Sequence, residues 1–331
     1  MLAVVCAVAL VGIIVGAIWW FAGRGTAAES RGAIASVDAS GAPVERPDGL
    51  PAATALGVNE LRVRALDDVE AFYRDAIGLT VLEEAEGDVL LGLGDEPIIR
   101  LVQSSDPLPS PQDAGLYHTA ILFPDEPSLA ATLLRAAQAA PELYQGSADH
   151  LVSEAFYFGD PEGNGVEIYV DRPRAEWKWD DGIVEMGSEP LDPSAFIEEH
   201  LPGAEASGAA ELSATVGHVH LKVGDLERAR AFYADTLGFD VVSEAEGALF
   251  YSAGGYHHHL ATNIWQSAGA GPRSTEVGLG SVTVVLPDDE AVAAVAARLD
   301  DAGSSYETVS RGIVAADPWG NRIRLVSAAR D

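Results

Sequence analysis

An internal repeat is the feature of this sequence that most restricts its fold. The segment Gly57–Gly94 aligns without gaps on the segment Gly217–Gly254, at a constant offset. A second, looser pair of similar segments begins at His118 and at Ser281. A fixed repeat period indicates one supersecondary unit that is used several times. The chain after residue 50 is therefore predicted to contain four modules of about 50 residues each, which we call A, B, A′ and B′ in chain order.

The four modules share one order of predicted elements. Each opens with an alternating strand, as in residues 218–223, where polar and apolar side chains take turns. A short amphipathic helix follows, and in A and A′ it ends just before Gly78 and Gly238. Two or three further strands complete the module, with a turn Asp-Pro-x-Gly-Asn before the last strand of B and B′. The pattern predicts an α+β fold of four βαβββ modules.

The charge balance excludes some classes of function. The chain carries 51 acidic and 20 basic residues, for a formal net charge of −31, and only two of its cations are lysines. A protein with this field is not expected to bind nucleic acid. Because the acidic residues are spread along the chain after residue 28, we interpret them as a halophilic surface, kept hydrated at high salt. The single cysteine excludes an intramolecular disulfide and a cysteine-based zinc cluster.

The N-terminal segment differs from the rest of the chain. Residues 1–23 contain no charged side chain, and a helix of that length spans a hydrocarbon core of about 30 Å. Arg24 and Arg31 follow it, which predicts a transmembrane anchor with the modules on the cytoplasmic side. The alternative is an over-extended gene start. Residues 24–50 are predicted to be a flexible tether, 51–172 a first domain, 173–213 a connecting strap and 214–331 a second domain.

Several motifs carry a family resemblance. They are YHTA, DHLVSEAFYFGDPEGNGVEIY, DRPRAEWKW, GHVHL and GGYHHHLATNIWQ. Together with the repeat, they resemble the vicinal oxygen chelate superfamily of glyoxalases, bleomycin- and fosfomycin-resistance proteins and extradiol dioxygenases. Within it, residues 52–328 resemble the four-module catechol 2,3-dioxygenase-like branch. The resemblance implies that modules pair into two cupped sheets, and that a metal binds in a cup to residues of the first and last strands.

Only the two middle modules offer metal ligands at those positions. The aligned first-strand positions are Val58, His118, His218 and Ser281, and the last-strand positions are near Ile98, Glu167, the run His257–His259 and Arg324. Strand alternation independently places Glu167 opposite an apolar face. If consecutive modules paired, each cup would hold only half a site. Pairing B with A′ instead collects His118, Glu167 and His218, a 2-His-1-carboxylate set typical of non-haem Fe(II) oxygenases, and leaves A with B′ as a metal-free cup.

The resemblance also implies roles for further residues. His150 and Tyr157 precede Glu167 as a substrate-binding pair does in extradiol dioxygenases. The run His257–His259 resembles the family motif His-His-Ser-Leu-Ala, which makes His258 the acid–base residue. Strand alternation instead aims His257 and His259 into the cup, so His259 is the alternative. Three more residues that face the cup are candidate substrate contacts: His220, Tyr169 and Asn263.

These residues predict an Fe(II)-dependent extradiol dioxygenase that cleaves a catechol-type aromatic with O2. One alternative is a glyoxalase-like isomerase or lyase, which would use Mn, Ni or Zn with His257 or His259 as a fourth ligand. Another is a non-catalytic binding or resistance protein, because fold alone does not determine function. The sequence does not determine whether the chain forms a homo-oligomer. It contains no P-loop, dinucleotide fingerprint or Gly-x-Ser-x-Gly elbow.

Overall fold

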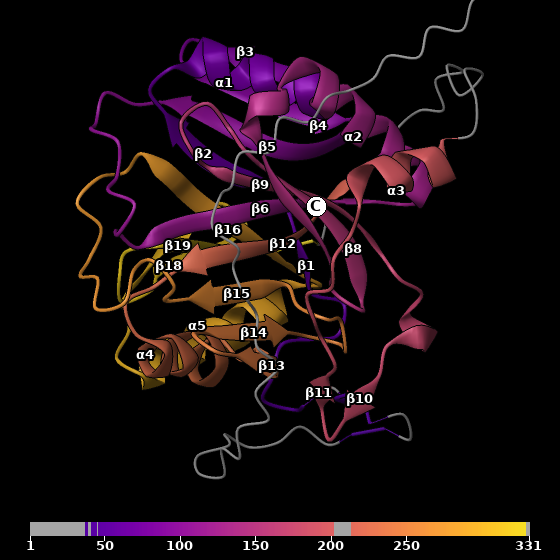
Figure 1. The fold of residues 1–331 in the computed structure, drawn as a ribbon. Coiled ribbons are helices and arrows are strands. Elements are labelled where there is room, and N and C mark those ends of the chain that lie inside the picture. The colour runs from indigo at the N-terminus through magenta and orange to yellow at the C-terminus, as the bar shows by residue number, and fades with distance from the viewer. Residues whose placement is uncertain (1–36, 39–40, 45, 202–212, 329–331) are drawn as a thin grey trace, which may run out of the picture.

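The computed structural model describes residues 37–38, 41–44, 46–201 and 213–328. Within these ranges, all four predicted βαβββ modules are present (Figure 1). The predicted apolar helix at residues 1–23 lies outside the described residues, as does much of the predicted tether. In the ranges that are described, no helix is long and apolar enough to cross a membrane.

Modules A and A′ are built alike. In both, the short α-helix continues as a π-helical turn, and the chain then reverses at Gly78 or Gly238, with φ of +89° and +94°. Glycine adopts this left-handed conformation without a steric penalty, which explains its place in the repeat. Module A consists of β2 (Asn59–Val63), α1 (Leu66–Phe72), the turn Tyr73–Ile77, β3 (Thr80–Ala85), β4 (Asp88–Leu93) and β5 (Glu96–Gln103). Module A′ consists of β12 (Thr215–Lys222), α4 (Leu226–Arg230), the turn Ala231–Thr236, β13 (Asp240–Ala245), β14 (Ala248–Ser252) and β15 (Leu260–Asn263).

Modules B and B′ have longer helices with aspartate caps. The Asp125 side chain accepts a hydrogen bond from the Ser128 N–H, and Asp288 accepts one from Ala291, which satisfies a free donor in the first turn of each helix. Module B consists of β6 (Gly115–Phe123), α2 (Glu126–Ala139), a short 3₁₀ turn (Pro141–Leu143), β7 (Tyr144–Asp149), β8 (Ser153–Gly159) and β9 (Gly165–Asp171). Module B′ consists of β16 (Gly278–Leu286), α5 (Asp289–Asp301), β17 (Tyr306–Val309), β18 (Gly312–Ala316) and β19 (Arg322–Ser327).

Two large sheets join modules that are not adjacent in sequence. The first, which we call the B–A′ sheet, has the strand order β13-β14-β15-β12-β6-β9-β8-β7. The second, the A–B′ sheet, has the order β17-β18-β19-β16-β2-β5-β4-β3, and β1 (Ala55–Leu56) pairs with β16. The first strands of the paired modules meet antiparallel at the centre of each sheet. The predicted pairing of B with A′ and of A with B′ is therefore confirmed.

Modules that are consecutive in the sequence, A with B and A′ with B′, contact each other through their helices. The helix α2 of module B packs against the π-helical turn of module A. On the other side of the molecule, Arg298 of α5 donates hydrogen bonds to the carbonyls of Thr236 and Leu237, at 3.1 and 2.7 Å. Buried side chains from both sheets and from these helices form one continuous core. The two sheets are therefore fixed relative to each other, although each contains strands from both halves of the chain.

A connecting segment covers part of the B–A′ sheet. Residues 173–191, which we call the strap, contain a 3₁₀ turn (Arg174–Glu176) and the hairpin of β10 (Trp179–Asp180) and β11 (Ile183–Val184), and α3 (Pro193–His200) follows (Figure 1). Trp177 is buried and donates from Nε1 to the Arg172 carbonyl at 3.0 Å. Trp179 and Met186 pack against Phe250 and its apolar neighbours on the A′ strands. This part of the predicted connecting segment 173–213 is therefore packed against the sheet.

Candidate metal centre

Three ligand-type side chains meet on one face of the B–A′ sheet: His118 on β6, Glu167 on β9 and His218 on β12. Oε2 of Glu167 lies 3.0 Å from Nε2 of His118 and 3.2 Å from Nε2 of His218. The three residues are 7%, 1% and 2% exposed. The pairing of β6 with β9 and with β12 brings them together from positions far apart in the sequence.

The spacing of the donor atoms fits a single metal ion. Two ligand atoms that are each about 2.1 Å from an ion, at right angles, lie about 3.0 Å apart, which matches the two carboxylate–imidazole distances. Nε2 of His118 is buried and, despite its approach to Glu167, makes no hydrogen bond within the described part of the chain. An unsatisfied buried polar atom costs about 1–3 kcal/mol, a cost that a bound cation removes. Two imidazoles and one carboxylate form the set used by non-haem iron sites with open coordination positions.

Burial and charge set the protonation of these ligands. Burial lowers the pKa of His118 to about 3, against the opposing charge of Glu167. Burial raises the pKa of Glu167, but the neighbouring His218 and His118 together lower this pKa by more than burial raises it, to about 2. At neutral pH, Glu167 is therefore a carboxylate and His118 a neutral imidazole. These are the forms that bind metal ions.

Two β-bulges shape this face of the sheet. In the pairing of β12 with β6, Gly217 has no partner on β6 and Tyr117 has no partner on β12. These residues occupy equivalent positions, each directly before a ligand histidine. A Cβ atom at Gly217 would lie 1.8 Å from the hydroxyl oxygen of Tyr169, so glycine leaves the space that this ring fills. The bulge at Tyr117 places its ring 5.0 Å from His220, measured between ring centroids. Strict strand alternation puts Tyr117 on the opposite face, so periodicity alone does not predict its place beside His220.

His150 and Tyr157 form a hydrogen-bonded pair beside the ligands. Tyr157 lies opposite Glu167 in the pairing of β8 with β9. Its hydroxyl is 2.6 Å from Nε2 of His150, and Nδ1 of His150 is 2.7 Å from the Gly187 carbonyl on the strap. Because a carbonyl only accepts, Nδ1 carries the proton of a neutral His150, and the Tyr157 hydroxyl donates to Nε2. Burial raises the pKa of Tyr157 well above its usual range, so it remains a donor.

The histidine run before β15 is divided between two environments. The ring of His258 lies 4.0 Å from that of His218, between centroids. Nδ1 of His259 instead lies 3.3 Å from both the Ser252 hydroxyl oxygen and the Ala253 nitrogen. Strand alternation does not describe this run, because the run precedes β15 and does not follow its period. The motif-based choice, His258, is the one beside the ligand set.

The three candidate substrate contacts lie around the same face. Asn263 donates from its amide to Nε2 of His220 at 3.0 Å, and both residues are buried. The ring of Tyr169 lies 4.9 Å from that of His218, and its hydroxyl hydrogen-bonds to Tyr256 at 2.7 Å. These contacts fix the three side chains within the protein, and their contact with substrate stays a prediction.

Strand register corrects two of the aligned last-strand positions. Glu167 pairs with Ala120, and the equivalent pairs elsewhere are His220 with Ala261, Glu60 with Arg100, and Thr283 with Arg324. The position in A is therefore Arg100 rather than Ile98, and the position in A′ is Ala261 rather than the histidine run. Since alanine cannot bind a metal, this position supplies no fourth ligand.

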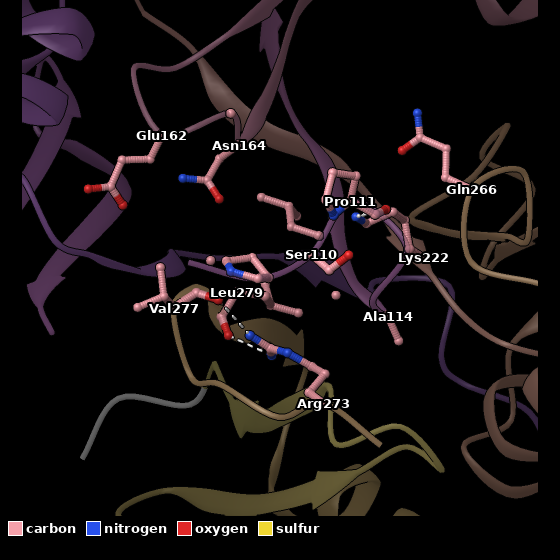
Figure 2. Close-up of a pocket in the computed structure, with 15 residues that line it drawn as sticks. Ser110, Pro111, Ala114, Glu162, Asn164, Lys222, Gln266, Arg273, Val277 and Leu279 are labelled. Carbon is pink, nitrogen blue, oxygen red and sulfur yellow. Dashed lines mark hydrogen bonds between the residues drawn. The ribbon is translucent and has the colours of Figure 1, made fainter. Parts of the chain in front are cut away.

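A separate hollow lies where β6 begins and β12 ends (Figure 2). Among its lining residues, Arg273 donates hydrogen bonds to the carbonyls of Leu279 and Val277, at 2.7 and 3.2 Å. Lys222 donates to the Pro111 carbonyl at 3.1 Å. These cations therefore bind the backbone at the junction between the sheets, and none of the candidate ligands lines the hollow.

Comparison with known proteins gives the class. The sequence profile of the Glyoxalase/Bleomycin resistance protein/Dioxygenase superfamily matches residues 55–168 and 215–325. The chain belongs to this superfamily, which confirms the resemblance seen in its motifs.

Two relatives and one solved structure are similar to this chain. Catechol-2,3-dioxygenase of Bacillus subtilis (strain 168) is 39% identical over 272 residues, which are 80% of this chain and 94% of the relative. The 2,2',3-trihydroxybiphenyl dioxygenase of Sphingomonas paucimobilis is 28% identical over 211 residues, 60% of this chain and 61% of that protein. A crystal structure from Bacillus subtilis subsp. subtilis str. 168 has the same fold, with a TM-score of 0.56 at 13% identity, covering 83% of this chain and 86% of that one. The identity to named dioxygenases supports a dioxygenase of this superfamily.

Proposed function

We propose that this protein is an Fe(II)-dependent extradiol dioxygenase that cleaves the ring of a catechol-type aromatic with O2. The observation that carries the proposal is the meeting of His118, Glu167 and His218 beside His258 and the His150–Tyr157 pair. The 39% identity to a catechol-2,3-dioxygenase supports the same reaction class.

The ligand set and its neighbours have separable tasks. Three protein ligands leave coordination positions open, where the two vicinal oxygens of a catechol could chelate. A bound ferrous ion would supply the Lewis-acid and redox chemistry of ring cleavage. The Tyr157 hydroxyl oxygen would accept a hydrogen bond from a substrate hydroxyl, and His150, whose two nitrogens bind Tyr157 and the Gly187 carbonyl, would orient it. His258, whose ring lies beside that of His218, would take a proton from substrate and return it. Burial lowers the pKa of His258 well below its usual value, so it is a neutral imidazole before it accepts that proton.

The surrounding side chains suit an aromatic ring. Phe250, Ala261 and Ala248 form a buried apolar cluster on the A′ strands, with Trp265 packed against it. The ring of Phe250 lies 5.1 Å from that of His258, between centroids. An apolar wall beside a few fixed polar groups is the usual composition of a small-molecule site.

The number of protein ligands distinguishes the oxygenase from the glyoxalase-like alternative. Such an enzyme generally uses four protein ligands, and the position equivalent to Glu167 in A′ is Ala261. His257 is engaged with Asp171 and His259 with Ser252, so neither belongs to the ligand cluster among the described residues. The geometry therefore favours the three-ligand oxygenase.

Reconstitution tests the proposal directly. The purified chain is loaded with Fe(II) without oxygen, mixed with a panel of catechols and exposed to air, while O2 uptake and the yellow ring-fission product are recorded. We expect both with Fe(II), and neither with a Zn(II)-loaded sample. Because the acidic surface predicts a salt requirement, the assay is run at low and at molar KCl. Iron binding without O2 uptake across the panel at both salt concentrations contradicts the proposal.

A further inference from the structure

A line of hydrogen-bonded side chains ends at His258. Asp171 is the last residue of β9, four residues beyond Glu167, and so lies on the same face of the strand. Its Oδ1 is 2.8 Å from Nε2 of His257. Nδ1 of His257 is in turn 2.8 Å from Nδ1 of His258. The carboxylate comes from module B and both histidines come from module A′, so the line crosses between the paired modules.

The direction of these hydrogen bonds follows from the chemistry of each group. An ionised carboxylate can only accept, and the Asp171 side chain keeps contact with solvent, at 22% exposed. His257 must therefore donate from Nε2. A neutral His257 then has a lone pair on Nδ1, and the facing Nδ1 of His258 must carry the proton. Nε2 of His258 is left as the basic nitrogen.

Aromatic rings shield this line from water. His257 is fully buried, and its ring lies 4.2 Å from Tyr256 and 5.2 Å from Trp177 of the strap, between centroids. The Arg174 guanidinium lies over both of these rings, 5.2 Å from the centroid of Tyr256 and 5.5 Å from that of Trp177. Excluding water strengthens the hydrogen bonds and restricts the rotation of His257.

We propose that Asp171 and His257 are positioning residues that hold His258 in the Nδ1–H tautomer and in a fixed orientation, with Nε2 available to accept a proton from substrate. The proposal rests on the proposed function for the role of His258, but the tautomer itself can be observed without turnover. For a histidine that binds a metal ion, removing the partner that fixes its tautomer and orientation typically costs 10–100-fold in metal affinity or activity, and we expect an effect of similar size for His258.

The kinetic test replaces the acceptor. In Asp171→Ala, the Nε2–H of His257 loses its acceptor, so the proton position on both imidazoles is no longer set. We expect kcat for ring cleavage to fall about 10–100-fold, with iron content and KM for catechol unchanged. Asp171→Glu, which keeps an acceptor, should recover part of the loss. The matched control is Asp88→Asn, a half-buried carboxylate that pairs with Arg100 in the A–B′ sheet, for which kcat should not change.

A spectroscopic test separates the inference from the proposed function. The full chain, labelled with ¹⁵N-histidine and loaded with diamagnetic Zn(II), is analysed by ¹H–¹⁵N correlation through the imidazole ring. Wild-type protein should show His258 protonated at Nδ1, and Asp171→Ala should show a mixture of tautomers. A wild-type His258 protonated at Nε2, or full kcat in Asp171→Ala, overturns the inference even if ring cleavage is confirmed. The expected tautomer in a protein that never consumes O2 supports the positioning and refutes the proposed function.

Discussion

The two sheets of this protein are built from the same kind of module and in the same strand order, yet among the described residues only the B–A′ sheet brings a cluster of potential metal ligands together. In the B–A′ sheet, the equivalent first-strand positions are His118 and His218, and in the A–B′ sheet they are Val58 and Ser281. The last-strand position that holds Glu167 in one sheet holds Arg100 in the other, where it pairs with Asp88. The module therefore supplies positions, and a few substitutions at those positions decide whether a site exists.

The two sheets also differ in their contact with solvent. Glu167 is 1% exposed, whereas the Arg100 side chain is 40% exposed. The strap covers part of the B–A′ sheet through Trp179 and Met186. Charges interact more strongly when water is excluded, so a carboxylate in the covered sheet attracts a cation more strongly than the same group would in the open one.

The largest expected effect comes from removing the charge at the aligned last-strand position, which Glu167 occupies in the B–A′ sheet and Arg100 in the A–B′ sheet. Glu167→Gln removes the only anionic ligand of the set, and we expect metal affinity to fall by at least about 100-fold, with loss of ring cleavage. Arg100→Gln, at the equivalent position of the A–B′ sheet, should leave metal affinity unchanged. Metal titration followed by elemental analysis measures both. Equal metal content in wild type and Glu167→Gln would show that the ion binds elsewhere.

A second prediction concerns the residues opposite these positions. Tyr157 faces Glu167 across β8 and β9, as Leu90 faces Arg100 across β4 and β5. Tyr157→Phe removes the hydroxyl that donates to His150, and we expect kcat to fall about 100-fold while bound iron remains. Leu90→Met should change neither. Steady-state O2 uptake and iron content give the result, and a Tyr157→Phe enzyme with full kcat would remove Tyr157 from the mechanism.

A third prediction uses two glycines that the repeat aligns. In Gly217→Ala, the new methyl group would meet the buried ring of Tyr169, and we expect the free energy of unfolding to fall by about 1–3 kcal/mol. In Gly57→Ala, the nearest atom is a methyl carbon of Val285 at 3.1 Å, so the loss should be smaller. Chemical denaturation of both variants measures the difference. Equal losses would mean that Tyr169 moves aside without cost.

The last prediction is that two substitutions in the A–B′ sheet leave the amount of bound iron unchanged. Val58→Ala and Ser281→Ala change the A–B′ positions that align with His118 and His218, and bound iron should be the same as in wild type. Both variants are compared by iron content after identical reconstitution. A loss of iron in either variant would contradict the assignment of A–B′ as the metal-free sheet.

Much of the site could be predicted because its signals are local. Glu167 opposes an apolar face in an alternating strand, and His118 and His218 occupy aligned positions in a repeat, so residue type and period were sufficient. Asp171 has the same signal, because it lies four residues beyond Glu167 on the same face of the strand, and alternation could have identified it. Tyr117 carried none, because a β-bulge breaks the alternation on which the prediction depends.

The four modules and their βαβββ order follow from the repeat and from local periodicity. The aligned positions in the repeat supply the candidate ligands and the pairing of modules that brings them together. Long-range packing, in contrast, fixes which histidine of the run lies beside the candidate ligands, because the run precedes β15 and its position depends on contacts with Asp171, Tyr256 and the strap. The tertiary structure also decided that Ala261 takes the position of a fourth ligand, because the register between strands is fixed by long-range pairing. Local periodicity specifies which face a side chain takes, and long-range contacts specify what it meets there.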